Sequence, residues 1–465
     1  MNELGTTYRA GDRPSPLSSS FSVARRLAIP LFSILLSIPA TSQTVTTVAS
    51  FPGDNATEYP GGTPAQGRDG ELYGTSFGTT YGSVFKVSTG GSIKQLYALD
   101  GTNAINPFSG LTMSSDGSFY GTSSTGTGSA NAGVLFRVTP GGIYTVLHEF
   151  TENSSSEIPT APPTLASNND LYGTAYSSVY SYTPSGTFST VISFTDVEGL
   201  TDPLVQASNG NLYGTGNDGG ANKCGGIFEI TPAGSLLNTY SFNCTSQGGD
   251  PGGPLIQASD GNFYGLTPGD GKYDFGTVFR MNQKGIVTPI YSFQGAPSDG
   301  VGCALGLVQG TDGYLYGVTQ QGGTNGNGII FQISTAGAYT VLYNFPQDTA
   351  LPFGLLQHTD GKFYGFDAIA GTSGYGTVFS LDMGLGPFVT FVRHFGGVGQ
   401  TVQILGQGLT GATSVTFNGV TATSFSVVKD TFMTAVVPSG ATTGPVVVTT
   451  RSGALTSNVS FRVIP

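Results

Sequence analysis

The sequence predicts an all-β protein, because its repeats point to stacked four-stranded sheets. An aromatic residue or Leu followed by Tyr-Gly occurs seven times, in steps of 41 to 52 residues, at Tyr73, Tyr120, Tyr172, Tyr213, Tyr264, Tyr316 and Tyr364. A period of this length is typical of repeated supersecondary units. Each unit holds four short apolar runs joined by turn residues, with nothing long enough for a helix. The units predict a β-propeller of seven blades, and a smaller β-sandwich follows them.

A turn pair precedes each Tyr-Gly. Asp-Gly or Asn-Gly begins at Asp69, Asp116, Asn209, Asp260, Asp312 and Asp360, and the third unit has Asn169-Asp170 instead. We expect two-residue hairpins here, because both residues of such a pair tolerate positive φ. A variable loop, an apolar third strand such as Val278-Phe279, a Thr-Pro-x-Gly turn and a fourth strand ending in an aromatic residue complete the unit.

The two ends of the repeated part predict that it closes on itself. The last unit stops after its third strand, Thr377 to Leu381, and has no fourth strand. An extra β-rich run, Thr44 to Phe51, stands ahead of the first full unit. Pairing the two would complete the seventh blade and remove both free sheet edges. A kelch-like or solenoid stack is the alternative.

The repeat motifs also carry a family resemblance. The pattern Asp260-Gly-Asn-Phe-Tyr-Gly265, then Gly276 to Phe279 and Tyr291 to Phe293, resembles the bacterial GloVer tandem repeat, from about Thr44 to Met383. That family is defined by its repeats, so the resemblance implies a fold and no catalytic residues.

From about Gly386 the period stops and several short strands follow. Gly406 to Leu409, Ala412 to Gly419, Val437-Pro438 and Thr443 to Val446 match, residue by residue, motifs of the IPT/TIG immunoglobulin-like domain. The resemblance implies a β-sandwich that serves as a spacer or interaction module. The chain has no Trp, which excludes an antibody-type domain.

The first residues predict export. Arg25-Arg26, the apolar run Leu27 to Ile38 and Ala40-Thr41-Ser42 have the order of a secretory signal peptide. We therefore divide the chain into a signal peptide (1–42), a propeller (44–383) and an IPT/TIG-like sandwich (386–465). The mature protein is expected to be secreted, extracellular or attached to the cell surface, with the periplasm as an alternative and no membrane span after cleavage.

Two of the three cysteines are placed to pair. Cys224 and Cys244 flank the third and fourth strands of one blade and lie at nearly equal distances from the turn at Ala233-Gly234. We predict that they form a disulfide, as an exported protein permits. Cys303 is left over, and we expect it to be a small buried residue near the channel.

Acidic residues gather in the loops of variable length. Strand alternation places the Asp-Gly and Thr-Pro-x-Gly turns on one face, and the loops after Tyr-Gly and the connections between blades on the other. The second face holds 15 acidic residues: Asp54, Glu58, Asp100, Glu152, Glu157, Asp196, Glu198, Asp202, Asp218, Asp250, Asp270, Asp274, Asp299, Asp348 and Asp367. Only Lys223 and Lys272 oppose them.

This face predicts a binding surface for a cationic partner or Ca²⁺. The candidate ligands are Asp196, Glu198, Asp202, Asp218, Asp270 and Asp274. The alternative is that Asp suits loops and keeps a sparsely charged protein soluble. We expect no obligate cofactor, with Ca²⁺ as the open case, and a carbohydrate or surface protein as partner. Nucleic acid is disfavoured by the negative charge.

Familiar catalytic motifs are absent from the sequence. His148, His358 and His394 are the only histidines and do not cluster, and neither a Gly-x-Ser-x-Gly elbow nor a phosphate-binding loop occurs. We expect a non-catalytic binding or adhesion protein. A glycan-active hydrolase or lyase with paired carboxylates at the channel is the main alternative, and a structural spacer is the third.

Overall fold

The computed structural model describes residues 43–53, 57–78, 81–101, 104, 106–107, 109–125, 133–151, 158–302, 306–347 and 351–464. Ser42–Pro465 form one compact unit. The predicted signal peptide lies outside the described residues, as do Cys303, Asp54, Glu152, Glu157 and Asp348. No helix in the described ranges is both long and apolar enough to cross a membrane.

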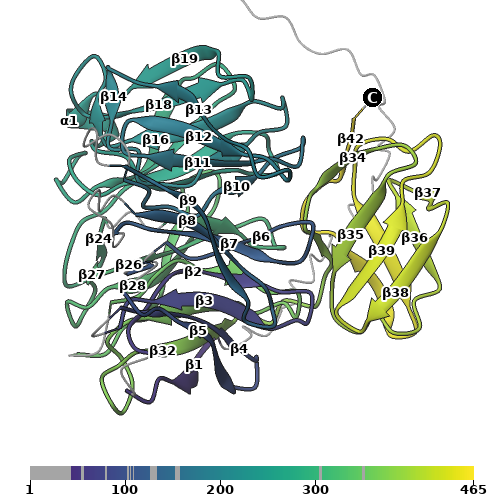
Figure 1. Ribbon diagram of the computed structural model, residues 1–465. Coiled ribbons are helices and arrows are strands. Elements are labelled where there is room, and N and C mark those ends of the chain that lie inside the picture. The colour runs from purple at the N-terminus through teal and green to yellow at the C-terminus, as the bar shows by residue number, and fades with distance from the viewer. Residues whose placement is uncertain are drawn as a thin grey trace, which may run out of the picture. The chain divides into compact units, whose positions relative to one another are not determined.

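Each Tyr-Gly unit forms one four-stranded antiparallel sheet, and we number these units repeats one to seven (Figure 1). Repeat one contains β2 (Pro60–Gln66), β3 (Leu72–Ser76), β4 (Ser83–Val87) and β5 (Ile93–Ala98). Repeat two contains β6 (Thr112–Met113), β7 (Phe119–Ser123), β8 (Val134–Val138) and β9 (Tyr144–Glu149). Repeat three contains β10 (Thr164–Leu165), β11 (Leu171–Ala175), β12 (Ser178–Tyr182) and β13 (Phe188–Ser193). Repeats four and five contain β15 (Val205–Gln206), β16 (Leu212–Gly216), β18 (Gly226–Ile230), β19 (Leu236–Ser241); and β20 (Gly252–Gln257), β21 (Phe263–Thr267), β22 (Thr277–Met281), β23 (Val287–Ser292). Repeats six and seven contain β25 (Leu307–Gln309), β26 (Leu315–Thr319), β28 (Ile329–Ile333), β29 (Tyr339–Asn344); and β30 (Leu356–Gln357), β31 (Phe363–Asp367), β32 (Thr377–Asp382), β1 (Thr44–Ser50).

The first and last strands of the repeated part are neighbours. β1 pairs antiparallel with β32, with Thr44 opposite Asp382 and Ser50 opposite Thr377. The sheet of repeat seven therefore takes its fourth strand from the start of the chain, as the sequence predicts. This pairing covers the edge that each strand would otherwise expose.

The Tyr-Gly pair has a packing reason. In repeat five, Gly265 lies opposite Phe279 of the neighbouring strand. A Cβ on Gly265 would come 2.5 Å from the tip of the Phe279 ring, so the ring needs a glycine beneath it. The preceding residue, Tyr264, is fully buried and its hydroxyl donates to Asp260 at 2.8 Å. The repeated tyrosine is thus a core residue with a hydrogen-bonded tip.

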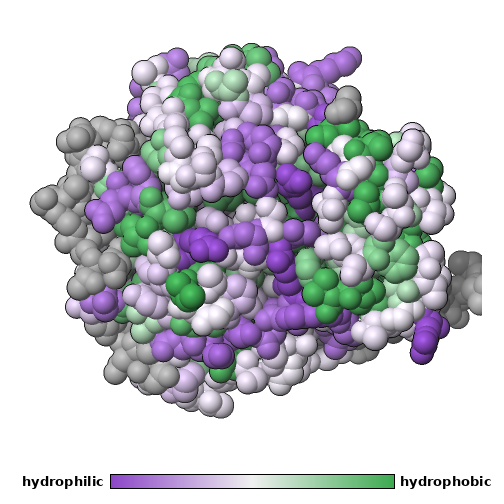
Figure 2. All heavy atoms as spheres, turned by 45° about the vertical axis from the view of Figure 1, so that its right-hand side comes forward, coloured by the Kyte–Doolittle hydropathy of each residue, from purple (hydrophilic) through white to green (hydrophobic). Residues whose placement is uncertain are grey.

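Neighbouring sheets pack face to face through buried apolar side chains. Between repeats four and five, Tyr213 and Ile227 share one cluster with Leu255, Phe263 and Phe279. Similar clusters join the other repeats. On the outer surface, hydrophobic and hydrophilic side chains are interspersed in small patches (Figure 2).

The Asp-Gly turns differ from the expected two-residue hairpins. In repeat five, the amide of Ala258 donates to Asn262 and that of Gly261 to Ala258, so the loop has three residues. Gly261 alone has positive φ (81°), because the Asp260 carboxylate instead accepts from the amide of Asn262 at 3.0 Å.

The third repeat follows the same plan with a shift of one residue. Asn168, and not Asn169, stands in the Asp position and bonds the Tyr172 hydroxyl at 2.9 Å. Asn169 takes the glycine position with φ of 71°, which Asn tolerates. The pair equivalent to Asp-Gly is therefore Asn168-Asn169.

A set of glutamines links the turns of successive repeats, and we call it the glutamine ladder. Gln66, Gln206, Gln257, Gln309 and Gln357 end the first strands of repeats one, four, five, six and seven. Each side-chain oxygen accepts from a turn amide of the preceding repeat, at 2.7 to 3.1 Å, from Thr359, Ser167, Ser208, Ser259 and Thr311 respectively. Repeats two and three have Met113 and Leu165 at this position, so the ladder has a gap there.

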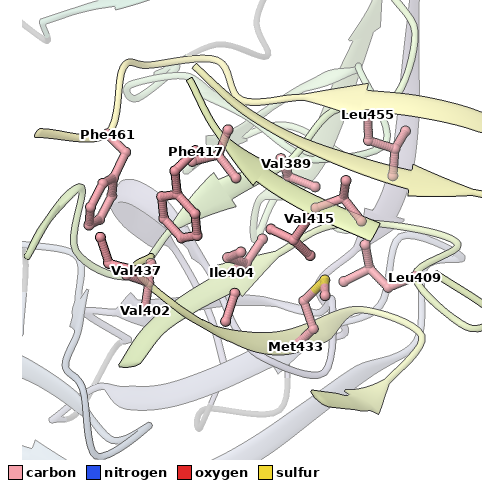
Figure 3. Close-up of a cluster of buried hydrophobic side chains, with 13 residues drawn as sticks. Val389, Val402, Ile404, Leu409, Val415, Phe417, Met433, Val437, Leu455 and Phe461 are labelled. Atoms are coloured by element: carbon pink, nitrogen blue, oxygen red, sulfur yellow. The ribbon is translucent and has the colours of Figure 1, made fainter. Parts of the chain in front are cut away.

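The C-terminal region, residues 386–464, contains two four-stranded sheets. Its strands are β33 (Thr390–Phe391), β34 (Phe395–Gly397), β35 (Thr401–Leu405), β36 (Ser414–Phe417), β37 (Val420–Thr421), β38 (Phe425–Lys429), β39 (Phe432–Val436), β40 (Val446–Thr450), β41 (Gly453–Thr456) and β42 (Arg462–Ile464). Side chains of both sheets converge on one core, where Ile404 and Met433 meet Val415 and Phe417 (Figure 3).

The C-terminal region contacts the turns where the ladder has its gap. Gln403 Nε2 donates to the Ser115 carbonyl at 2.8 Å, and Thr431 Oγ1 to the Arg68 carbonyl at 2.7 Å. The Arg68 guanidinium donates to Gln403 Oε1 at 2.7 Å and lies 4.7 Å from the Phe432 ring centroid. The region therefore lies on the side of the turns, and these contacts leave the variable loops uncovered.

Candidate functional site

The variable loops form the loop side of the repeats, opposite the turn side that carries the Asp-Gly turns. Two short ladders join these loops to the connections between repeats: β14 (Val197–Glu198) with β17 (Asp218–Gly219), and β24 (Gly300–Val301) with β27 (Gln321–Gly322). An isolated bridge between Gly249 and Gly269 does the same between repeats four and five. The loop side is thus held in place by backbone hydrogen bonds.

A disulfide anchors the loops of repeats four and five. Cys224 and Cys244, the pair expected from the sequence, are bonded, with Cα atoms 5.4 Å apart. Cys244 begins the short helix α1 (Cys244–Gln247), which the Asn243 side chain caps. The Cys224 carbonyl accepts from the Asp250 amide at 3.0 Å, and the Cys244 carbonyl accepts from the Gly271 amide at 3.2 Å. Each half of the disulfide therefore fixes the backbone beside an acidic residue.

Four acidic residues lie on neighbouring loops beside this disulfide, and we call Glu198, Asp218, Asp250 and Asp270 the acidic loop cluster. Glu198 and Asp218 are direct partners in the β14–β17 pair, so their side chains extend from the same side about 5 Å apart. Burial, followed by the negative charges of Asp270 and Asp218, raises the pKa of Asp250. The cluster concentrates negative charge on fixed loops.

No described Lys or Arg forms an ion pair with the acidic loop cluster. Every ion pair formed by the described residues lies at the turns or strands of the other side, as in Lys86 with Glu71 at 2.6 Å and Arg137 with Asp116 at 2.9 Å. Like charges placed opposite each other without a counter-ion are destabilising. Among the described residues, the cluster therefore has no Lys or Arg at ion-pair distance.

A metal site is not formed by these side chains alone. Among the described residues, no group of three or more His, Cys, Asp or Glu is arranged to hold a metal ion. Bound Ca²⁺ takes six to eight oxygen ligands, which a pair of carboxylates does not supply. A Ca²⁺ site would need further oxygens from backbone or water.

The other predicted ligands are Asp196, Asp202 and Asp274, of which Asp196 lies next to the cluster, two residues before Glu198. Asp196 is exposed and contributes its carbonyl to the loop backbone, accepting from Gly220 at 2.7 Å. Asp274 is exposed in the loop of repeat five, next to Tyr273, whose ring lies 4.7 Å from the Lys272 ammonium. Asp202 is half-buried, accepts from Thr215 at 3.3 Å, and burial raises its pKa to about 7.

Comparison with known protein families gives a match that includes all the repeats. The model of the Gloeobacter/Verrucomicrobia repeat matches residues 33–203, 127–314 and 200–431. The chain belongs to the Gloeobacter/Verrucomicrobia repeat family. These matches overlap one another, include every Tyr-Gly unit and extend into the C-terminal region. No match is found among curated proteins.

Solved structures give weaker similarities to this member of the Gloeobacter/Verrucomicrobia repeat family. Virginiamycin B lyase from Staphylococcus aureus is 17% identical, covering 73% of this chain and 98% of its own, with a TM-score of 0.49. A fungal alcohol oxidase of the AA5 family, in complex with copper, is 12% identical over 91% and 99%, with a TM-score of 0.47. Oligogalacturonate lyase from Vibrio parahaemolyticus is 11% identical over 73% and 93%, with a TM-score of 0.46. Similarities at this level carry no inference about the activity of the repeat protein.

Several acidic residues counted on the loop side of this repeat protein are not surface charges. Asp299 is 3% exposed and accepts from the hydroxyls of Tyr291 and Tyr339, both at 2.6 Å. Asp367 is 2% exposed; burial raises its pKa to about 6, against the opposing effect of three backbone amides. Glu58 is also buried. The sequence count overestimates the negative charge of this side, because burial cannot be inferred from loop position.

Three grooves lined by described residues do not bring two carboxylates together. One is lined by Asp116 with Tyr120 and Asn169, and the other two by neutral residues or Arg393. His148 stacks on Phe188 with ring centroids 3.4 Å apart, and burial with nearby Arg462 lowers the pKa of His394 to about 4.

Proposed function

We propose that this chain is an exported, non-catalytic binding protein that holds a cationic partner at the acidic loop cluster. The observation that carries the proposal is the contrast in charge pairing. Glu198, Asp218, Asp250 and Asp270 lack an ion-pair partner among the described residues, whereas four turn-side carboxylates pair with Lys or Arg: Asp69, Glu71, Asp116 and Asp382. A fixed, unneutralised group of charges attracts ions of opposite sign and speeds their encounter.

The partner class follows from the same chemistry. A basic segment of a surface protein, or a carbohydrate that bears amino groups, offers the positive charges the cluster lacks. Ca²⁺ is a competing occupant, since it could bridge Glu198 and Asp218 with water completing its shell. An anionic partner such as nucleic acid would be repelled. The disulfide and the β14–β17 pair support this proposal, because loops fixed in advance lose less entropy on binding.

The finer architecture belongs to the same proposal. Seven four-stranded sheets, with β1 completing the last, support a seven-bladed β-propeller. Two sheets around one core support an Ig-like β-sandwich of the IPT/TIG type in residues 386–464. A crystal structure with a different number of blades, or with the C-terminal strands continuing the propeller, would contradict this part.

Export is proposed from the signal-like start and is supported by the disulfide, which is typical of oxidising compartments. Expression of the full chain in a bacterial host with a secretion pathway tests it. We expect mature protein outside the cytoplasm with Gln43 at its N-terminus, as determined by N-terminal sequencing. Uncleaved protein retained in the cytoplasm would contradict export.

Binding of a labelled oligolysine peptide tests the functional proposal. Replacing Glu198→Gln, Asp218→Asn and Asp270→Asn together removes three charges with little change of shape. At about 0.5 kcal/mol for each exposed charge, the affinity should fall roughly tenfold at low salt. Wild-type binding should weaken as salt rises, and added Ca²⁺ should compete if it shares the site.

The matched control is Asp274→Asn, which removes an exposed loop carboxylate outside the cluster. Its affinity for oligolysine should remain within about twofold of the wild type. Equal affinities for the triple variant and this control would show that oligolysine responds to net charge alone, and the cluster would lose its assigned role.

A further inference from the structure

A groove lies between the turns and the C-terminal region, and its lining is neutral, unlike the acidic loop cluster. It has a volume of about 430 Å³, within the usual range for ligand pockets. Ser259, Gln309 and Thr311 line it from the turns, and Phe388, Thr456 and Asn458 from the C-terminal region. In Figure 2, hydrophilic side chains gather along the border between the repeats and the C-terminal sheets.

The turns that form this groove belong to a regular series. The residue two places after each ladder position is Arg68, Ser115, Ser167, Ser208, Ser259, Thr311 or Thr359. In repeats seven, one, two and three, the carbonyl of this residue accepts from Phe388 N, Thr431 Oγ1, Gln403 Nε2 and Arg393 at 3.1, 2.7, 2.8 and 3.4 Å. The C-terminal region thus occupies four consecutive acceptor positions of the series.

The other three acceptor positions are not used in this way. No described residue donates a hydrogen bond to the carbonyl of Ser208, Ser259 or Thr311. Ser259 and Thr311 line the groove, and their amides are already bound to Gln309 and Gln357, at 2.8 and 3.0 Å. The groove therefore offers acceptors of the same kind that bind N–H and O–H donors elsewhere in the series.

The opposite wall adds an acceptor without a partner. Asn458 Oδ1 is enclosed and has no hydrogen-bond partner among the described residues, while the backbone N–H of Asn458 donates to the Val389 carbonyl at 3.2 Å. A buried acceptor left unsatisfied costs free energy, and a ligand donor recovers it if the Asn458 side chain turns Oδ1 toward the groove on binding. The hydroxyls of Ser259 and Thr456 complete a wall of neutral polar groups.

We propose that this groove binds a neutral, polyhydroxylated ligand, such as a sugar unit of a polysaccharide. The ligand must bring several O–H donors, because the groove supplies carbonyl, amide and hydroxyl acceptors. None of the described side chains that line the groove is charged, so a buried cation or anion would remain uncompensated there. The site is separate from the acidic loop cluster and takes a different class of ligand.

A glycan array with neutral, anionic and amino-bearing oligosaccharides tests the proposal on the mature protein. Wild type should retain neutral glycans, with little dependence on salt because no charge is involved. Ser259→Trp should fill the groove and abolish this binding, and Asn458→Ala should weaken it roughly tenfold, about the effect of one hydrogen bond of good strength.

Ser208→Trp is the matched control, because Ser208 holds the same turn position one repeat earlier and does not line the groove. It should bind neutral glycans as the wild type does. The variant with three neutralised cluster residues should also bind them, which separates this site from the proposed function. Absence of neutral-glycan binding by wild type, or equal binding by Ser259→Trp and Ser208→Trp with unchanged melting temperatures, would overturn the proposal.

Discussion

Carboxylates on the two sides of the repeats have different bonding partners. On the turn side, Asp69 accepts from Tyr73 at 2.8 Å and from Lys86 at 3.1 Å, and Asp360 accepts from Tyr364 at 2.8 Å. On the loop side, Glu198 and Asp218 lie opposite each other with no described cation between them. The turn-side carboxylates are hydrogen-bonded within the fold, whereas this loop-side pair has no tyrosine or lysine partner among the described residues. Charges left without a counter-ion on fixed loops are the ones we assign to binding.

Removing the disulfide should have the largest effect on the loop side. A Cys224→Ala, Cys244→Ala variant frees a segment with a sequence separation of 20, which should lower the free energy of unfolding by about 3 kcal/mol. It should also weaken oligolysine binding, because Asp250 and Gly271 are bonded to the two cysteines. Urea unfolding measures the first effect. Reductant should reproduce it in the wild type and leave the variant unchanged; an unaltered urea midpoint in the variant would refute the anchoring role.

Loss of one tyrosine hydroxyl should lower the free energy of unfolding on the turn side and leave it unchanged on the loop side. Tyr264→Phe removes the donor to Asp260 and should cost about 2 kcal/mol, as for hydrogen bonds to charged groups. Tyr273→Phe, on the exposed loop, should cost nothing measurable. Burial raises the pKa of Asp260, but hydrogen bonds from Asn262 and Tyr264 outweigh it and hold the pKa below 3.8. The ionised form therefore stabilises the fold above that pH, and this contribution is lost as the pH falls through the folded-state pKa.

The pH dependence of Tyr264→Phe checks that sign. The difference in unfolding free energy between wild type and variant should be largest at neutral pH and shrink in acid. If the difference stayed constant down to acid pH, the hydroxyl would act through packing and not through the carboxylate.

Asp202 should show the opposite pH dependence, with a smaller effect. Burial raises its pKa from 3.8 to about 7, so the fold favours the protonated form. The stabilisation is complete below 3.8 and lost as the pH rises through about 7. Asp202→Asn should therefore gain about 1 kcal/mol over wild type at pH 8, a value reduced because the side chain is half-buried. The gain should vanish near pH 4, and urea unfolding at both pH values measures it; a variant no more stable at pH 8 would exclude a raised pKa.

Local repeats made most of the fold predictable. The Tyr-Gly period, the spare strand at Thr44 and the symmetric placement of Cys224 and Cys244 depend on short-range spacing, which the sequence displays directly. The type of hairpin was harder to predict from the sequence. The Asp260 carboxylate accepts a hydrogen bond from the Asn262 amide within the turn, and only Gly261 has a positive φ.

The candidate site was only partly predictable. Glu198, Asp218 and Asp270 were expected on one side, but their grouping with Asp250 depends on contacts between different repeats. Burial of Asp299 depends on two tyrosines from neighbouring repeats and has no signal in its own loop. The glutamine ladder did have a signal, since Gln recurs three residues before the turn Asp or Asn. Its interruption at Met113 and Leu165 could have indicated where the C-terminal region attaches.

The interrupted ladder has a further consequence. A closed circle of near-identical units has no intrinsic starting point, and any unit could accept the same attachment. The absence of glutamine at Met113 and Leu165 makes repeats two and three unlike the rest, and Gln403 donates to Ser115 in the turn of repeat two. The C-terminal region can therefore recognise one part of the circle, which fixes its position relative to the loops of repeats four and five.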